Sequence, residues 1–184
     1  MLNKSASNIV NALLFQATWF ACVIGGAHSI LWPALLSCGA LMFWQLSPKR
    51  RHPSDVLLVI VAIVLGSVID SLWIQGGFLS YQHQWPLKNT APAWIIILWA
   101  AFALTINHSL NWLKLNPLLP ALAGLIGAPL SYVAGEKLGA IKYQSDGLFV
   151  CSSIGIVWAL VVSLMFLVSI QSSYKNKLLK RNHD

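Results

Sequence analysis

Charged residues are scarce in this sequence. Asp, Glu, Lys and Arg make up 9% of the 184 residues, whereas a soluble domain carries about 25%. Because so few charges cannot cover a water-facing surface of this size, the composition excludes an ordinary soluble domain. The length fits one domain, and we assign residues 1–170 to it, followed by a basic tail over residues 171–184.

Cofactor motifs are also missing. The three cysteines, Cys22, Cys38 and Cys151, form no CxxC pair, so they do not indicate a redox or zinc site and read as small buried apolar residues. No HExxH spacing, Walker loop, nucleophile elbow or dinucleotide fingerprint occurs. We therefore expect no metal and no cofactor.

Acidic residues are fewer than basic ones, five against twelve, which gives a formal net charge of +7. The basic residues are confined to short segments between long apolar runs. This segregation is typical of membrane loops rather than of a nucleic-acid-binding face. We expect membrane lipids as partners and no nucleic acid. A second copy of this chain or other membrane proteins could also bind it.

Apolar runs dominate what is present, since 57% of the residues are hydrophobic. A helix needs about 20 such residues to cross a bilayer, and the runs are continuous rather than alternating as in barrel strands. Backbone groups in lipid must be bonded within their own segment, which favours helices. The sequence predicts an all-α, polytopic transmembrane bundle of about six spans: 8–27, 29–46, 55–75, 93–113, 118–138 and 148–170.

The basic residues also predict the orientation. With the N-terminus inside, nine of the twelve Lys and Arg residues fall on the inner side and three on the outer side. We therefore expect a bacterial inner (cytoplasmic) membrane protein with both termini in the cytoplasm. The first run is long for a signal-peptide core and contains Asn11 and Gln16, so we expect it to be retained as a helix.

Small residues form a stripe along the fifth predicted span. Ala123, Gly127, Ser131, Gly135 and Gly139 follow one another at intervals of four, which places them on one helix face. Such a face lets a neighbouring helix approach closely in lipid. We expect it to pack against the sixth span or against a shared neighbour, and leucine at Gly127 to weaken assembly.

Asp70 lies within an apolar run and shares its helix face with Ser67, Ser71 and Gln75. A carboxylate inside a membrane costs at least about 2.5 kcal/mol and usually faces the bundle interior. In the predicted orientation it lies in the outer half of the bilayer. It either performs chemistry or binding there, or only bonds to neighbouring helices.

Three further residues approach the same level: His28, Tyr132 and Glu136. Together with Asp70 they predict an outer pocket that could transfer protons, bind a lipid head group or carry a proton. The structural alternative is that Glu136 and His28 only mark span ends. A metal held by His28, Asp70 and Glu136 has no support from local spacing.

Polar residues also gather at the inner end of the fourth span, from Thr105 to Asn111. They could line a second cavity on the cytoplasmic side, although such residues more often cap a span end. Asn11 and Thr18 share a face of the first span and could bond across helices. The basic residues of the tail, from Gln171 to Asp184, could lie on anionic lipid or simply fix the topology.

Several motifs carry a resemblance: Asn11 with Phe15-Gln16, Gly66 with Asp70, Trp94 with Leu98-Trp99, and the run from Gly127 to Tyr132. With them the chain resembles an uncharacterised family of small bacterial inner-membrane proteins. The resemblance implies no activity. Members look like neighbours of lipid-modifying enzymes such as relatives of cyclopropane-fatty-acid synthase, which implies a membrane-lipid or envelope-stress setting.

Three functions follow as hypotheses. The first is binding or handling of a lipid or small apolar molecule at an outer-leaflet pocket around Asp70. The second is a membrane-embedded enzyme that uses Asp70, His28 and Glu136 as acid-base groups. The third is a structural partner of other membrane proteins.

Overall fold

The computed structural model describes residues 3–181 and the side chains through Lys175. Six α-helices and a short 3-10 helix follow one another, joined by a two-stranded sheet: α1 (Lys4–His28), α2 (Trp32–Gln45), α3 (Asp55–Gln75), β1 (Leu79–Tyr81), α4 (Ala93–Ala103), η1 (Asn111–Leu115), α5 (Leu118–Lys137), β2 (Ile141–Tyr143) and α6 (Gly147–Arg181).

Four helices are long and apolar enough to cross a membrane: α1, α3, α5 and the segment Gly147–Lys175 of α6. This finding supports the predicted membrane protein with an all-α body. Helices α2 and α4 have 14 and 11 residues, fewer than the roughly 20 that a complete crossing needs. The count of six full spans therefore stays a prediction.

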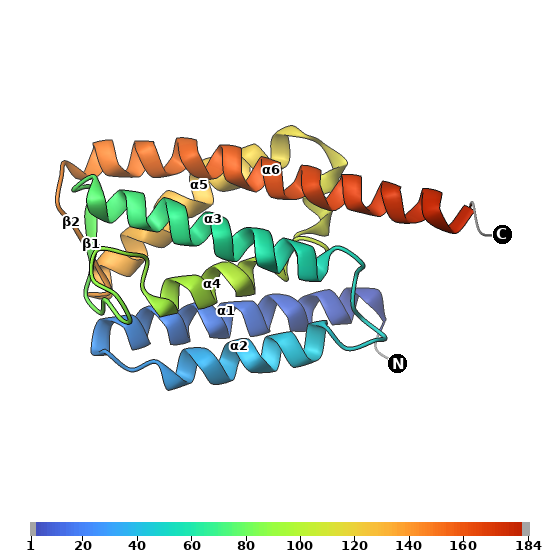
Figure 1. Cartoon of the computed structure of the whole chain (residues 1–184), viewed down its shortest axis with the longest axis horizontal. Helices are drawn as coiled ribbons and strands as arrows, with labels where there is room; N and C mark the ends of the chain where they lie inside the picture. The colour runs from blue at the N-terminus through green and yellow to red at the C-terminus, as the bar shows by residue number, and fades with distance from the viewer. Residues whose placement is uncertain (1–2, 182–184) are drawn as a thin grey trace.

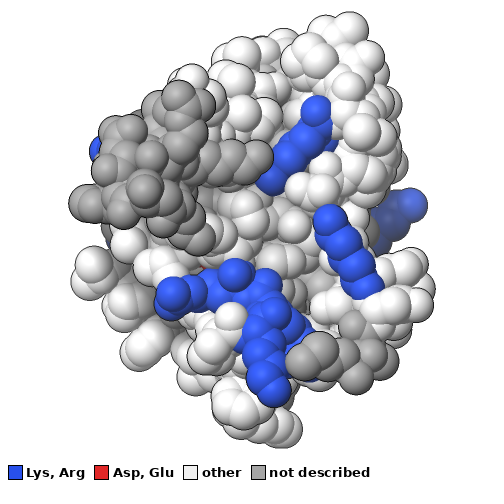
Figure 2. Space-filling view, turned by 90° about the vertical axis from the view of Figure 1, so that its right-hand side faces the viewer, with Lys and Arg blue, Asp and Glu red and all other residues white. Residues whose placement is uncertain are grey.

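The long helices lie side by side, so the bundle has two ends (Figure 1). One end carries β1 and β2, and we name it the sheet end. The other carries the start of α1, the connection between α2 and α3, and both chain termini, and we name it the basic end. Figure 2 looks onto the basic end and shows Lys and Arg side chains gathered there. Termini at one end fit an even number of crossings.

Helix α4 ends ten residues earlier than expected. The sequence predicts a span to Leu113, but the helix stops at Ala103 and a series of turns leads to η1. The Thr105 hydroxyl donates to the Phe102 carbonyl at 2.6 Å, and the Leu110 amide donates to the Thr105 carbonyl. Irregular backbone at membrane depth is tolerated where protein encloses it, and Thr105 is buried. The polar run thus begins with a bond that caps α4 and continues as buried turns.

The small sheet was not predicted. Strands β1 and β2 pair antiparallel, with Ser80 opposite Lys142 and Tyr81 opposite Ile141. The Gln82 amide and the Ala140 carbonyl extend the ladder. Because the strands come from two different connections, the pairing ties the loop after α3 to the turn after α5. It thereby carries Tyr81 over the sheet end of α3.

Helix α6 also runs further than the predicted sixth span. It continues to Arg181, so residues 171–181 extend the helix where the sequence suggested a separate polar tail. Residues 182–184 of that tail lie outside the described residues, as do the side chains from Asn176 onward. Contact of the tail with anionic lipid stays a prediction.

Candidate functional site: a buried carboxylate behind an apolar cavity

Asp70 is completely buried and is held by donors from three other elements. The hydroxyl groups of Tyr81 and Tyr132 both donate to its Oδ1, the latter at 2.7 Å. The indole Nε1 of Trp99 donates to its Oδ2 at 2.7 Å. Since each donor comes from a different element (β1, α5 and α4), the carboxylate joins them all to α3.

Trp99 reaches Asp70 because α3 offers no side chain in its path. A Cβ on Gly66, one turn before Asp70, would lie 2.3 Å from the Trp99 ring. The Trp99 ring also stacks on Trp158 of α6, with ring centroids 4.3 Å apart and planes tilted by 20°. The indole is therefore clamped between α3 and α6 with its N–H aimed at the carboxylate.

Tyr81 is fixed in a similar way. Its ring packs edge-on against Trp94, with centroids 5.4 Å apart, and the side chain is only 3% exposed. Burial, and then the neighbouring Asp70 carboxylate, raises the pKa of Tyr81 well above its ordinary value. The phenol therefore keeps its proton and remains a hydrogen-bond donor to Asp70.

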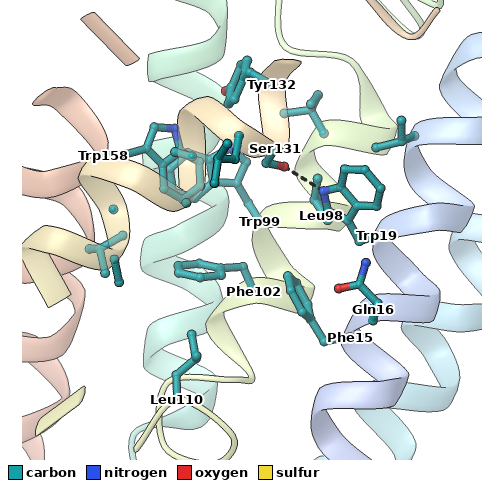
Figure 3. A pocket seen from close by; sticks show the side chains of 18 of the residues that line it. Phe15, Gln16, Trp19, Leu98, Trp99, Phe102, Leu110, Ser131, Tyr132 and Trp158 are labelled. Carbon is teal, nitrogen blue, oxygen red and sulfur yellow. Dashed lines mark hydrogen bonds between the residues drawn. The ribbon is translucent and has the colours of Figure 1, made fainter. Parts of the chain in front are cut away.

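An apolar cavity of about 480 Å³ lies beside this cluster, between α1, α4 and α5 (Figure 3). Its deep wall consists of buried side chains that include Trp19, Trp99 and Tyr132. Its rim carries Gln16 of α1 and Gly127 of α5, both of which are exposed. The cavity thus opens at the side of the bundle, between α1 and α5.

One hydrogen bond bridges α1 and α5 across the cavity. The Trp19 indole Nε1 donates to the Ser131 hydroxyl oxygen at 2.8 Å, as the dashed line in Figure 3 shows. Phe15 and Phe102 line the wall further along, toward the basic end, with centroids 6.2 Å apart. The few polar groups of the lining are thus set in an otherwise aromatic and aliphatic surface.

Asp70 itself does not line the cavity, whereas two of its three donors do. Trp99 and Tyr132 present their rings to the cavity and their polar atoms to the carboxylate. Because all the bonds converge on one buried group, Asp70 sets the positions of two wall residues. The arrangement can shape a binding surface, while the carboxylate stays behind it.

Of the predicted pocket residues, the structure brings only Tyr132 to Asp70. His28 is exposed, and its Nδ1 contacts the Ile24 carbonyl at 3.0 Å. Glu136 accepts from the Tyr143 amide at 3.4 Å. Neither is bonded to Asp70, because the α1–α2 hairpin and the end of α5 hold them elsewhere at the sheet end.

Ser67 and Ser71 lie on another face of α3 from the apolar cavity. The Ser71 hydroxyl donates to the Ser67 carbonyl and accepts from the Ala91 amide at 2.9 Å. Both serines line a separate groove that Trp85 and Leu87 of the long loop also line. Their position fits a role in holding that loop against α3.

The close approach of α5 and α6 differs from the expected stripe. The two helices do pack together, as predicted. The contact runs through Gly124, whose added Cβ would lie 2.3 Å from the Trp158 carbonyl oxygen, and Gly155, whose added Cβ would lie 2.7 Å from that of Leu125. Gly127 has no atom within 4 Å of such a Cβ, because this face borders the cavity.

The remaining stripe residues have other neighbours. Ser131 bonds to Trp19 of α1, and a Cβ on Gly135 would meet the Ile141 side chain at 2.9 Å. Gly139 lies beyond α5 with φ of +80°, a backbone conformation that glycine adopts without strain. The spacing of four identified a common face for the stripe residues within α5, but not the partner of that face, and Gly139 lies outside the helix.

A second buried carboxylate, Asp55, went unnoticed in the sequence because it begins a span, where an acidic residue is ordinary. It is fully buried and contacts Asn107 and His108, which belong to the polar run after α4. That run and Asn11 were the only sequence signals of this cluster. Tyr81 and Trp99 were missed as well, since nothing in a sequence marks which aromatic residue reaches Asp70.

Among residues 3–175, no three His, Cys, Asp or Glu side chains are grouped closely enough to hold a metal ion. The polar atoms around Asp70 are hydroxyl and indole donors.

Comparison with known proteins places the chain without assigning an activity. No curated protein and no solved structure matches it. The family described as "Protein of unknown function (DUF2878)" matches residues 8–164, which include Asp70, the cavity lining and Asp55. Since the match spans most of the 184 residues, the chain belongs to the DUF2878 family.

Proposed function

We propose that this protein binds the apolar chain of a lipid or lipid-like molecule in the cavity between α1 and α5. The observation that carries the proposal is the position of the opening. Gln16 lies twelve residues from either end of α1, Lys4 and His28, or about 18 Å at 1.5 Å per residue. Gly127 is likewise near the middle of α5.

An opening at this depth faces hydrocarbon rather than water, because both rim helices are among the four that can cross a membrane. A molecule that enters must therefore come from the lipid phase. The apolar lining and the volume of about 480 Å³ fall within the usual range for small-molecule sites. An acyl or isoprenoid chain meets both conditions.

The depth of the cavity favours a thin occupant over a partner helix. Trp99 and Tyr132 line it although they are only 2% and 6% exposed. An α-helix with its side chains is about 10–12 Å across, too wide to reach walls so far inside the bundle. A partner helix would contact only the rim.

Polar atoms near the rim supply specificity. The Ser131 hydroxyl accepts from Trp19 and keeps its own proton for donation. The exposed Gln16 amide also lines the cavity. In hydrocarbon such groups gain from meeting a hydrogen-bonding oxygen on the occupant, so a chain with a carbonyl or hydroxyl suits the site better than a plain alkane.

In this proposal Asp70 is a positioning residue. Its oxygens are taken by Tyr81, Tyr132 and Trp99, so it acts through the wall rather than on the occupant. The alternative of an enzyme needs an acid-base group at the cavity, and neither Asp70 nor the exposed His28 lines it. The geometry therefore favours binding over catalysis.

We further propose that the basic end lies in the cytoplasm of a bacterial inner membrane. Basic residues concentrate in cytoplasmic loops, and Lys4, Arg50, Arg51 and Lys114 belong to segments at that end. The cavity then lies in the middle of the bilayer, with Asp70 on its outer side. A reporter fused after Arg181 tests this sidedness, and a periplasmic signal would reverse it.

Photolabelling tests lipid binding directly. The protein is placed in nanodiscs that contain a phospholipid with a diazirine near the end of one acyl chain, irradiated, digested and mapped by mass spectrometry. Labels are expected on residues of the cavity wall, such as Phe15 and Phe102. Uniform labelling of all lipid-facing positions would contradict the proposal.

A filled cavity provides the decisive variant. Gly127→Leu places a side chain in open space at the rim, and we expect it to reduce wall labelling at least fivefold while the protein stays folded. Gly39→Leu is the matched control, because Gly39 is exposed on α2 and has no atom within 4 Å of an added Cβ. Loss of self-association in Gly127→Leu with unchanged labelling would favour a second copy as the occupant.

A further inference from the structure

A connected set of polar side chains, separate from the Asp70 cluster, lies toward the basic end. Asp55 is its acidic member and is fully buried. Its Oδ1 accepts from Asn107 Nδ2 at 2.8 Å. Its Oδ2 accepts from the His52 backbone amide at 2.7 Å and lies 3.0 Å from His108 Nε2. The carboxylate therefore ties α3 to the turns that follow α4.

The orientation of one amide in this set is fixed by backbone groups. Asn11 of α1 accepts at Oδ1 from the Ser109 backbone N–H at 3.3 Å and from the Ser109 hydroxyl at 2.7 Å. Its Nδ2 donates to the Leu104 backbone carbonyl at 3.0 Å. A backbone N–H can only donate and a carbonyl can only accept. Asn11 therefore cannot be turned around without losing these bonds.

The fixed amide determines the next two groups. Asn11 Nδ2 also donates to Gln45 Oε1 at 2.8 Å, so the amide nitrogen of Gln45 is the atom that faces His108 Nδ1, at 3.1 Å. An amide nitrogen offers only donors, so His108 Nδ1 must accept. The ring proton then lies on Nε2 and is donated to Asp55.

We infer that protonation of His108 acts as a switch in this cluster: the neutral ring accepts at Nδ1 from the Asn11–Gln45 amide chain, which cannot reverse, and a second ring proton removes that acceptor. A proton on Nδ1 would set two donors against each other. Rotating the Gln45 amide would only move the conflict, since its nitrogen would then face Asn11 Nδ2. Binding of the proton therefore separates His108 from Gln45 and removes the bond between α2 and the turns after α4.

The charged groups around His108 come from several elements. Asp55 of α3 is in direct contact and favours the proton. Lys114 of η1 lies further away, where its Nζ donates to Asn107 Oδ1 at 2.7 Å, and its positive charge opposes the proton. The positive charge of Lys4 of α1 in turn repels that of Lys114. His52 of the α2–α3 connection adjoins Asp55. From α6, the described neighbours are neutral, with the Ser169 hydroxyl donating to Asn107 Oδ1 at 2.6 Å.

The released segment also forms part of the cavity. Leu110 and Leu113, which follow His108, line it together with Phe102. The backbone from Leu104 to Ser109 carries the bonds to Asn11 on its other side. Proton binding should therefore loosen this part of the cavity wall, whether or not a lipid occupies the cavity.

Nitrogen-15 NMR of histidine-labelled protein in nanodiscs tests the site. Five histidines are present, and His108→Gln identifies the signal of His108. At pH 7.5 we expect the Nε2–H tautomer. On acidification the doubly protonated ring should appear together with faster amide hydrogen exchange over residues 104–113. An Nδ1–H tautomer at pH 7.5, or no change in exchange when the ring is protonated, would overturn the inference.

Gln45→Glu replaces the donor that faces His108 Nδ1 with an acceptor. The variant therefore distinguishes a protonation switch from a merely structural bond. The new carboxylate accepts both from Asn11 Nδ2 and from a protonated His108, so the ring should take its proton at a higher pH than in the wild-type protein. Exchange over residues 104–113 should no longer rise with protonation. Gln75→Glu, the same change at the exposed sheet end of α3, is the control. An unchanged titration in Gln45→Glu would contradict the site, and the wild-type tautomer decides the matter if that variant does not fold.

Discussion

The two buried carboxylates of α3 are bound in different ways. Asp70 receives bonds from two phenols and an indole, and its cluster ends at these rigid rings. Asp55 receives bonds from an amide, an imidazole and a backbone N–H, and its cluster continues to Lys114 and Gln45. The three rings around Asp70 are rigid and hold the carboxylate in place. An extended set that contains an imidazole can change its protonation.

This contrast assigns separate tasks to the two regions. The Asp70 region sets the deep wall of the cavity, since Trp99 and Tyr132 belong to both. The Asp55 region controls the turns after α4 that complete the wall toward the basic end. Removal of Asp70 should therefore cost stability, whereas changes near Asp55 should alter the response to pH.

The largest effect is expected from Asp70→Ala. It leaves the Tyr81, Tyr132 and Trp99 donors without an acceptor in a buried site, and each unpaired group costs about 1–3 kcal/mol. Asp70→Asn should cost less, because its amide oxygen can still accept from the two phenols and only the Trp99 N–H loses its partner. Thermal unfolding in detergent measures the order. Equal stability of the two variants would show that the three bonds do not hold the region together.

A smaller effect is expected where α5 approaches α6. In Gly124→Ala the new Cβ would meet the Trp158 carbonyl oxygen, and overpacking of this kind costs about 1–3 kcal/mol. It should displace Trp158, and with it the Trp99 ring that reaches Asp70. Gly127→Ala, on the cavity face of α5, should be neutral or stabilise by up to about 1 kcal/mol, because alanine favours helix. Unfolding of both variants in the same detergent compares them, and the reverse order would restore the stripe through Gly127 as the packing face.

The smallest effect is a pH dependence near Asp55. Burial, partly offset by the charge of Asp55, lowers the pKa of His52 in the folded protein. The unfolded chain then binds the proton more readily, so stability should fall as the pH drops below the ordinary histidine value of 6.5. Melting temperatures between pH 8 and pH 5 measure this fall.

His52→Gln should reduce that pH dependence, and His28→Gln should leave it unchanged because His28 is exposed. A His52→Gln protein with the full wild-type pH dependence would remove His52 from the explanation.

The sequence predicted the residues whose chemistry conflicts with their surroundings. Asp70 stands alone in an apolar run, and burial of a carboxylate among helices follows from the cost of exposing it to lipid. Tyr132 was predicted because its position along the fifth span places it at the same depth in the membrane as Asp70. Tyr81 and Trp99 could not be found, because β1–β2 pairing and the Gly66 contact bring them to Asp70. Both depend on neighbours that are distant in the sequence.

Errors arose where a local rule had more than one outcome. The stripe through Gly127 identified one face of α5, yet that face borders the cavity and Gly124 makes the close contact. The polar run after Ala103 could have capped a span or lined a cavity. It does neither alone, because Asn107 and His108 turn toward Asp55 and end the helix early.

Local sequence determined that this chain forms apolar helices and concentrates positive charge in a few connections. These properties depend only on the order of residues and the cost of exposing the backbone to hydrocarbon. Tertiary packing alone decided that α1 and α5 stand apart around a cavity and which rings surround Asp70. It also decided which way the amides of Asn11 and Gln45 point. Hydrogen bonds between helices are directional, and their partners are chosen by distances that no single segment contains.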